Sequence, residues 1–266
     1  MTRYPEDHWI RSRDAPAALG RYLDQQRTAY GRLKNRFVRE LIGDVRGKRV
    51  LDYGCGGGCF VVDAAEAGAA AVVGVDAEDA VLGTAGLFAE LRGVAGRCRF
   101  VRSDGLAGAV RDECFDVILL KDVLEHVDDD LGLLRDAAAH LRRGGALVVS
   151  TQNSLSLNYL TQGLYHRVLL GDGSWYGWDE THLRFYTFVG LARKLRLAGL
   201  HPLRWRSTYL VPHRFTRRTA SGKRIHRVEA LACCEPLLGR VPPLDRLGWN
   251  LLVKAGPVAE VPRACR

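Results

Sequence analysis

The sequence Val50-Leu51-Asp52-Tyr53-Gly54-Cys55-Gly56-Gly57-Gly58 is the most informative stretch of this 266-residue chain. It begins with the residues of a largely buried strand, and the glycines that follow predict a tight turn. A helix from Phe60 to Ala67 is expected next. Glycine lets the backbone approach a ligand closely, and open α/β sheets bind nucleotides at the carboxyl ends of their strands. This stretch therefore predicts a nucleotide-type site.

A second apolar run, Val72-Val73-Gly74-Val75, predicts a strand that ends at Asp76, about twenty residues after the glycines. An acidic side chain at this position can accept hydrogen bonds from both hydroxyl groups of a ribose. A dinucleotide site prefers the spacing G-x-G-x-x-G, but here Cys59 stands where the third glycine would be. The spacing therefore favours a charge-balanced ligand without a pyrophosphate.

Strands and helices are expected to alternate up to residue 151. Further strands are predicted at Cys98–Arg102, Phe115–Leu120 and Ala146–Thr151. A helix from about Asp128 to Leu141 is expected to stop at the basic and glycine residues 142–145. The run Phe115–Leu120 is largely apolar, as a central parallel strand is. This alternation predicts an α/β fold with a doubly wound parallel sheet.

The glycine stretch resembles the first motif of class I S-adenosylmethionine-dependent methyltransferases. The order of the motifs resembles that of the ubiquinone-biosynthesis O-methyltransferase group and its small-molecule relatives. The resemblance is carried, over roughly the central 40% of the chain, by Val50–Gly58, Leu124–Val127, Gly144-Gly145 and Ser150-Thr151-Gln152-Asn153. It implies a Rossmann-like, seven-stranded sheet whose last strand is antiparallel, and S-adenosylmethionine as the cofactor. It specifies no substrate.

The resemblance also implies roles in the cofactor site. Asp76 would bind the ribose, Asp104 would accept from the adenine amino group, and the backbone of Lys121 would lie against the cofactor. Arg36 is the candidate to bind the cofactor's carboxylate, with Arg32 as a competitor. The expected cofactor-binding residues are Arg36, Asp52, Tyr53, Gly54, Cys55, Gly56, Asp76, Ala77, Ser103, Asp104, Gly105, Leu106 and Lys121.

Methyl transfer to a hydroxyl group requires that its proton be removed, and a histidine that titrates near neutrality can do this. His126 follows the fourth strand, beside the expected methyl position, and His182 lies where a long excursion rejoins the core. Both are candidate catalytic residues. The alternative for His126 is packing behind a capping box formed by Asp122 and Glu125 at a helix start. The alternative for His182 is that it braces the next helix.

A metal site is a further hypothesis at the same place. Asp122, Glu125 and His126 would share one face of such a helix, at the spacing i, i+3, i+4. The corresponding Glu, Glu and His positions of the ubiquinone enzymes have been linked to a metal. Asp122 has a shorter side chain than the first of those glutamates, so no metal is predicted here.

The segments around the core are expected to form the substrate pocket. Residues 1–48 would be a helical lid, with one helix from about Ala17 to Ile42 across the cofactor mouth. Residues 49–211 would be the cofactor-binding core, in which the excursion 152–182 is too long for an ordinary connection. Residues 152–188 hold 8 of the 22 aromatic residues, which favours either a wall for a ring-bearing substrate or ordinary packing.

The C-terminal part completes the predicted sheet. A helix is expected at Thr187–Leu197, followed by a sixth strand at Leu203–Val211. Residues 212–247 would form an inserted basic cap. Residues 248–266 would hold the last strand, at Trp249–Lys254, and a tail.

Charge is distributed unevenly along the chain. Residues 1–48 carry a net charge of +5, residues 49–200 carry −5, and residues 201–266 carry +9. The densest basic run extends from His213 to Arg227. Three explanations are open for it: a solvated helix face, a site for an anionic substrate, or an RNA-binding surface.

Composition narrows the class of protein. No apolar run reaches the length of a transmembrane helix, and the first residues lack the apolar core of a signal peptide. The seven cysteines include no C-x-x-C pair, so a cytoplasmic location is expected.

The sequence predicts a methyltransferase for a small aromatic or anionic metabolite, with oxygen as the preferred acceptor. The alternatives are an RNA methyltransferase and a cofactor-binding fold that performs a non-methylating reaction. A nicotinamide oxidoreductase is disfavoured by the glycine spacing.

Overall fold

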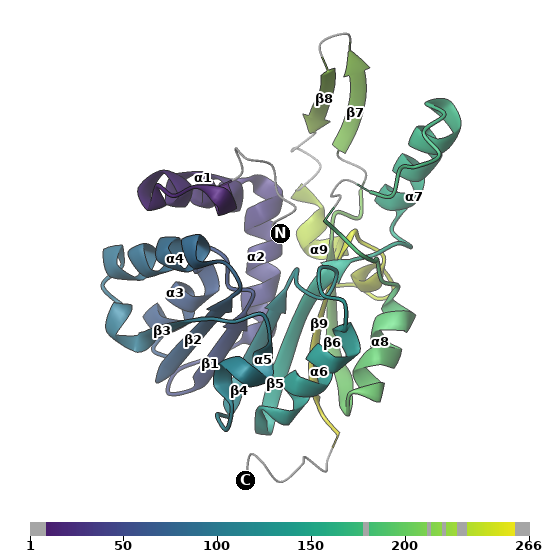
Figure 1. The fold of residues 1–266 in the computed structure, drawn as a ribbon. Coiled ribbons are helices and arrows are strands. Elements are labelled where there is room, and N and C mark those ends of the chain that lie inside the picture. The colour runs from purple at the N-terminus through teal and green to yellow at the C-terminus, as the bar shows by residue number, and fades with distance from the viewer. Residues whose placement is uncertain (1–8, 178–180, 212–213, 220–221, 228–232, 259–266) are drawn as a thin grey trace.

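The computed structural model describes all residues except 1–8, 178–180, 212–213, 220–221, 228–232 and 259–266. Its centre is a seven-stranded sheet with helices on both faces (Figure 1). The strand order is β3-β2-β1-β4-β5-β9-β6. The strands are β1 (Arg49–Tyr53), β2 (Ala71–Asp76), β3 (Cys98–Arg102), β4 (Phe115–Lys121), β5 (Leu141–Gln152), β6 (Leu200–Thr208) and β9 (Asn250–Pro257).

Strands β1 to β5 pair in parallel, whereas β9 is antiparallel to both of its neighbours, β5 and β6. The Rossmann-like sheet with an inserted antiparallel last strand, expected from the sequence, is therefore confirmed. Parallel strands have all their carboxyl ends at one edge, and that edge positions the site.

Helices cover the sheet on both sides. The described α-helices are α1 (Ala15–Arg27), α2 (Ala29–Ile42), α3 (Cys59–Glu66), α4 (Asp79–Leu91), α5 (Leu106–Val110), α6 (Asp130–Ala139), α7 (Leu157–Leu164), α8 (Phe188–Leu197) and α9 (Glu235–Leu238). Short turns of other helix types lie at Trp9–Arg11, Ala95–Arg97, Tyr165–Leu169 and Leu244–Arg246. Among the described helices, none is long and apolar enough to cross a membrane.

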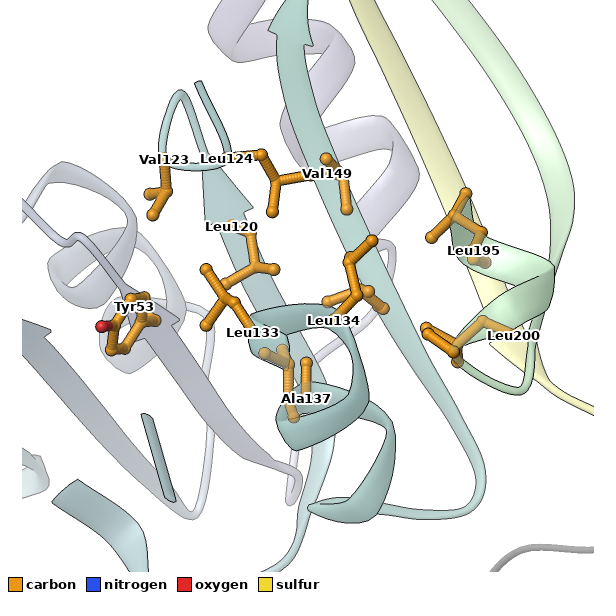
Figure 2. Packing of buried hydrophobic residues seen from close by; sticks show 14 of the residues in the cluster. Tyr53, Leu120, Val123, Leu124, Leu133, Leu134, Ala137, Val149, Leu195 and Leu200 are labelled. Carbon is orange, nitrogen blue, oxygen red and sulfur yellow. The ribbon is translucent and has the colours of Figure 1, made fainter. Parts of the chain in front are cut away.

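Alternate residues of the central strands enter two different cores. Leu120 of β4 and Val149 of β5 pack with Leu134 of α6 and Leu195 of α8 (Figure 2). Their neighbours Leu119 and Val148 belong to a second core, on the side of α2, α3 and α4. Because both faces of these strands are buried, their sequences are continuously apolar instead of alternating.

Two helix predictions were wrong. The helix expected from Ala17 to Ile42 is two helices, because the backbone of Thr28 is extended and its hydroxyl caps α2 by accepting from the Gly31 amide at 3.1 Å. The helix expected to reach Leu141 ends at Ala139 instead. Leu141 is fully buried and pairs with Phe115, so it begins β5. The residues expected to stop that helix belong to the strand.

The described residues of the basic run do not form the helix face considered from the sequence. They form two paired antiparallel strands, β7 (Arg214–Thr219) and β8 (Gly222–Arg227), separate from the main sheet. Figure 1 shows this strand pair beyond the carboxyl edge of the sheet. The sixth strand also lies three residues earlier than expected, at Leu200–Thr208.

Candidate functional site

A cavity of about 380 Å³ opens at the carboxyl ends of β1, β2 and β4. It is lined by Trp9, Ile10, Tyr53, Gly54, Gly56, Asp76, Ala77, Glu78, Val81, Ser103, Asp104, Asp122, Val123, His126 and Val127. Eight of the expected cofactor-binding and catalytic residues are therefore brought together here: Tyr53, Gly54, Gly56, Asp76, Ala77, Ser103, Asp104 and His126. Parallel strand pairing explains this, since it aligns the ends of β1, β2 and β4 at one edge.

Two residues of the glycine turn, Gly54 and Gly56, line the cavity. The amides of Gly54 and Cys55 both donate to the carbonyl oxygen of Val75, at 2.8 and 3.0 Å. Gly54 has a φ of +76°, and a Cβ atom added to it would collide with the Val123 side chain. Glycine is thus required by both backbone conformation and space, and the bare turn leaves room for a ligand.

Asp76 is held in a fixed orientation at the end of β2. Its Oδ2 atom accepts from the Gly56 amide at 3.0 Å, and its Oδ1 atom accepts from the Glu78 amide at 3.3 Å. Burial raises the pKa of the Asp76 carboxyl, and the backbone donors of Gly56 and Glu78 oppose this rise. Each oxygen retains acceptor capacity beyond its one bond, which a diol could use.

The other expected cofactor residues do not line this cavity. Leu106 is fully buried in the core at the start of α5, and the Gly105 amide is already bonded to the Ser103 hydroxyl at 3.2 Å. Cys55 and Asp52 are buried, and Arg36 is exposed on α2. Lys121 ends β4 and is likewise absent from the lining. The structure thus does not bring Arg36 to the cavity.

Lys34 is a residue near the cavity that was not predicted from the sequence. Its Nζ atom lies 2.7 Å from Oδ1 and 2.5 Å from Oδ2 of Asp122, which lines the cavity. A signal for it exists in the sequence. At helical spacing Lys34 falls on the same face as Tyr30, Phe37 and Leu41, all buried in α2, and a lysine within an apolar stripe is normally paired.

The capping box of Asp122 and Glu125, considered as the alternative to a catalytic role for His126, is absent, because the chain after β4 forms a turn and the next helix begins only at Asp130. Burial opposes ionisation of Asp122, but the ammonium groups of Lys121 and Lys34 outweigh it and hold the pKa well below its usual range. Ser150 Oγ also donates to Asp122, at 2.8 Å. Both oxygens of the Asp122 carboxylate thus already accept hydrogen bonds from protein donors. Asp122, Glu125 and His126 therefore do not form the metal-binding face considered from the sequence.

The two candidate catalytic histidines lie side by side. Their ring centroids are 4.8 Å apart, and His126 Nδ1 is 3.3 Å from the carbonyl oxygen and 3.2 Å from the hydroxyl oxygen of Thr181. Glu125 is fully buried next to them, and its Oε2 atom accepts from Thr151 Oγ1 at 2.8 Å. Burial, followed by the charge of Asp122, raises the pKa of Glu125. One potential metal-ligating atom from each of Glu125, His126 and His182 lies within 4.8 Å of the other two. Asp122 is not part of this group.

Known proteins are similar to this chain in sequence and in fold. The sequence model of a family described as "Methyltransferase domain" matches residues 22–204. A ubiquinone biosynthesis O-methyltransferase from Neisseria meningitidis serogroup C is 36% identical over 163 residues, which are 59% of this chain and 65% of the relative. The match thus spans just under two thirds of the relative's length.

Two solved structures have a similar fold. The magnesium protoporphyrin IX methyltransferase from Synechocystis PCC 6803, solved with bound SAH, covers 91% of this chain and 95% of its own, with a TM-score of 0.59 and 17% identity. The cyclase SpnF covers 88% and 85%, with a TM-score of 0.57 and 18% identity. At these identities the likeness concerns the fold alone.

Proposed function

The chain belongs to the methyltransferase domain family, and we propose that it transfers a methyl group from S-adenosylmethionine to a hydroxyl oxygen of a small molecule. The observation that carries this proposal is the arrangement at the cavity. An acidic side chain, Asp76, lies directly against a glycine turn, Gly54–Gly56, at the carboxyl edge of the sheet. This is where a ribose and its attached groups can lie against bare backbone.

The residues present fit that cofactor. The oxygens of Asp76 would accept hydrogen bonds from the ribose hydroxyls, and Ser103 and Asp104 would contact the adenine end. Trp9 and Ile10, which belong to the proposed lid of residues 1–48, would cover the ligand. When bound, S-adenosylmethionine supplies a methyl group on a positively charged sulfur. What the protein contributes is position and exclusion of water.

His126 is proposed as the base that accepts the proton of the acceptor hydroxyl. Because its Nδ1 atom faces the carbonyl oxygen of Thr181, the tautomer with a proton on Nδ1 is favoured, which leaves Nε2 to take a proton. His182 is proposed to assist at the same wall, with its ring against that of His126. The name of the Neisseria meningitidis relative supports oxygen as the acceptor atom and a ring-bearing substrate.

Calorimetric titration with S-adenosylmethionine and S-adenosylhomocysteine tests the cofactor. We expect micromolar binding by the wild type and loss of measurable binding in Asp76→Ala, because the ribose would lose both acceptor oxygens. Asp79→Ala is the matched control, since Asp79 is an exposed acid three residues further on, in the first turn of α4. Its affinity should equal that of the wild type.

Acceptors can then be sought by mass spectrometry. Incubation of the protein and S-adenosylmethionine with hydroxylated aromatic compounds should yield a product heavier by one CH₂ unit. Folded wild-type protein that binds neither S-adenosylmethionine nor S-adenosylhomocysteine, with NADH titrated beside them, would contradict the proposal. An altered acceptor without a mass gain would instead indicate a non-methylating reaction.

A further inference from the structure

One charged side chain in α2 lies in the buried, mainly apolar face of the helix and contacts a residue that is distant in the sequence. Lys34 is only 9% exposed, yet its ammonium group forms a bidentate ion pair with Asp122, which lies 88 residues later in the chain. A buried ammonium group is costly unless it is paired in this way. The position on α2 could be filled by leucine at no such cost, so the lysine needs an explanation beyond packing.

Its partner has an unusual backbone conformation. Asp122 has a φ of +57°, in the left-handed region that residues other than glycine rarely adopt. Such strain persists where surrounding contacts impose it. Here the contacts are the Lys34 pair, the Ser150 hydroxyl at 2.8 Å, and the Asp122 amide, which donates to the Ser150 carbonyl at 2.8 Å. The contacts of the Asp122 side chain thus hold a backbone conformation that would be unfavourable without them.

That conformation sets the direction in which the chain leaves β4. Val123, the next residue, lies in the space that a side chain at Gly54 would need, and its carbonyl oxygen accepts from the His126 amide at 2.9 Å. Val123 and His126 both line the cavity. A different φ at Asp122 would move both of them together.

We propose that Lys34 is a positioning residue for methyl transfer, which fixes the turn 122–127 through Asp122 and thereby orients the His126 imidazole. This inference rests on the proposed function, in which His126 accepts the proton. Lys121 also contacts Asp122, at 3.1 Å, but as the preceding residue on β4 it moves with the turn. Lys34 is an anchor from another element. It makes the site dependent on correct docking of the N-terminal helices.

The first test replaces Lys34 with methionine, which keeps the length of the side chain and removes its charge. NMR spectra of protein labelled with ¹³C-histidine report on the imidazole directly, and His126→Gln assigns its resonance. We expect Lys34→Met to displace the His126 resonance. With an acceptor found as above, kcat should fall about 10- to 100-fold, as expected for a misplaced catalytic group. Arg27→Met, an exposed cationic position at the end of the neighbouring helix α1, should change neither.

The second test separates positioning from general destabilisation. Glycine adopts a positive φ without strain, so Asp122→Gly should free the turn from its need for an anchor. In that background, adding Lys34→Met should alter kcat less than about twofold and leave the His126 resonance in place. This double variant also lacks the unpaired charge that could prevent Lys34→Met alone from folding.

Two results would overturn the inference. One is an unchanged His126 resonance in Lys34→Met. The other is an equal effect of Lys34→Met in the wild-type background and in the Asp122→Gly background, since Lys34 would then act by another route. Calorimetry with S-adenosylhomocysteine on every variant tests the proposed function independently of the role of Lys34. A wild type that does not bind this ligand would refute the proposed function, while the resonance comparison would still decide whether Lys34 positions His126.

Discussion

The hydroxyl group of Tyr53 donates a hydrogen bond to the backbone carbonyl oxygen of Asp104 at 2.9 Å. Tyr53 ends β1 and Asp104 follows β3, so this bond joins two cavity-lining segments from strands that are not neighbours in the sheet. Burial, followed by the charge of Asp104, raises the pKa of Tyr53 to about 12. The phenol therefore stays protonated and remains a donor at physiological pH.

Tyr53→Phe should weaken binding of S-adenosylmethionine about fivefold, because one neutral hydrogen bond that orders the Asp104 loop is lost. Calorimetry measures this directly. Tyr186→Phe is the matched control. Its hydroxyl bonds Asp130 at 2.6 Å and the Leu124 carbonyl at 3.1 Å, away from the cavity lining. That variant should lose about 2 kcal/mol of unfolding free energy and retain its affinity. The reverse pattern would contradict the assignment of Tyr53 to the site.

Gly54→Ala should be strongly unfavourable. The new Cβ would occupy the space of the Val123 side chain at a φ of +76°, so both the turn and the cavity wall must shift. We expect a loss of about 2–3 kcal/mol in unfolding free energy and no measurable cofactor binding. Gly86→Ala is the contrasting change, since Gly86 lies within α4 with open space around its Cβ position. It should stabilise the protein by up to about 1 kcal/mol. Chemical denaturation compares the two.

Asp52 should make stability depend on pH. Burial, reinforced by Asp76 and Asp63 and opposed by Lys121, raises its pKa to about 7 in the folded protein. Because the folded pKa lies above that of the unfolded chain, the folded state binds the proton more tightly, and stability falls as pH rises from about 4 through 7. This group alone could remove up to about 4 kcal/mol by pH 8.

Asp52→Asn should remove that dependence. Thermal unfolding at a series of pH values should show the variant equal to the wild type near pH 4 and more stable near pH 8. The exposed Asp79→Asn should follow the wild-type profile throughout. A wild type that grows steadily more stable from pH 4 to 8, in parallel with Asp52→Asn, would show that Asp52 ionises freely.

His126→Gln should lower kcat about 100-fold or more and change the affinity for S-adenosylmethionine little, because the base acts on the acceptor and not on the cofactor. His182→Gln should have a smaller effect on kcat, since His182 is absent from the cavity lining although its ring lies against that of His126. Single-turnover kinetics with an acceptor identified by mass gain distinguishes the two. Equal and small effects of both substitutions would leave the site without a histidine base.

The fold and part of the site were predictable from local sequence. Val50–Gly58, the acid at Asp76 and the apolar run of β4 each lie on one short segment, where the spacing of glycine, acidic and apolar residues reflects the local conformation. Parallel pairing then brings strand ends to one edge, so Gly54, Asp76 and Asp104 meet in one cavity as expected. The wrong predictions concern the ends of helices and strands, where a single contact can determine at which residue an element begins or ends. Thr28 divides the N-terminal helix with a side-chain cap, and Leu141 joins β5 because it pairs with Phe115.

The family of fold, the glycine turn and the acid beside it were thus encoded locally, because they depend on residues close together in the chain. Which distant side chains meet at the candidate site depends on tertiary contacts. Arg36 and Lys34 are two residues apart on α2, yet the helix directs Lys34 toward Asp122 and leaves Arg36 exposed. Tertiary contacts also hold Asp122 in a turn, with a positive φ, instead of at the start of a helix. Both outcomes depend on contacts between segments far apart in the chain, 88 residues for the pair of Lys34 and Asp122, and no local pattern encodes the energy of such contacts.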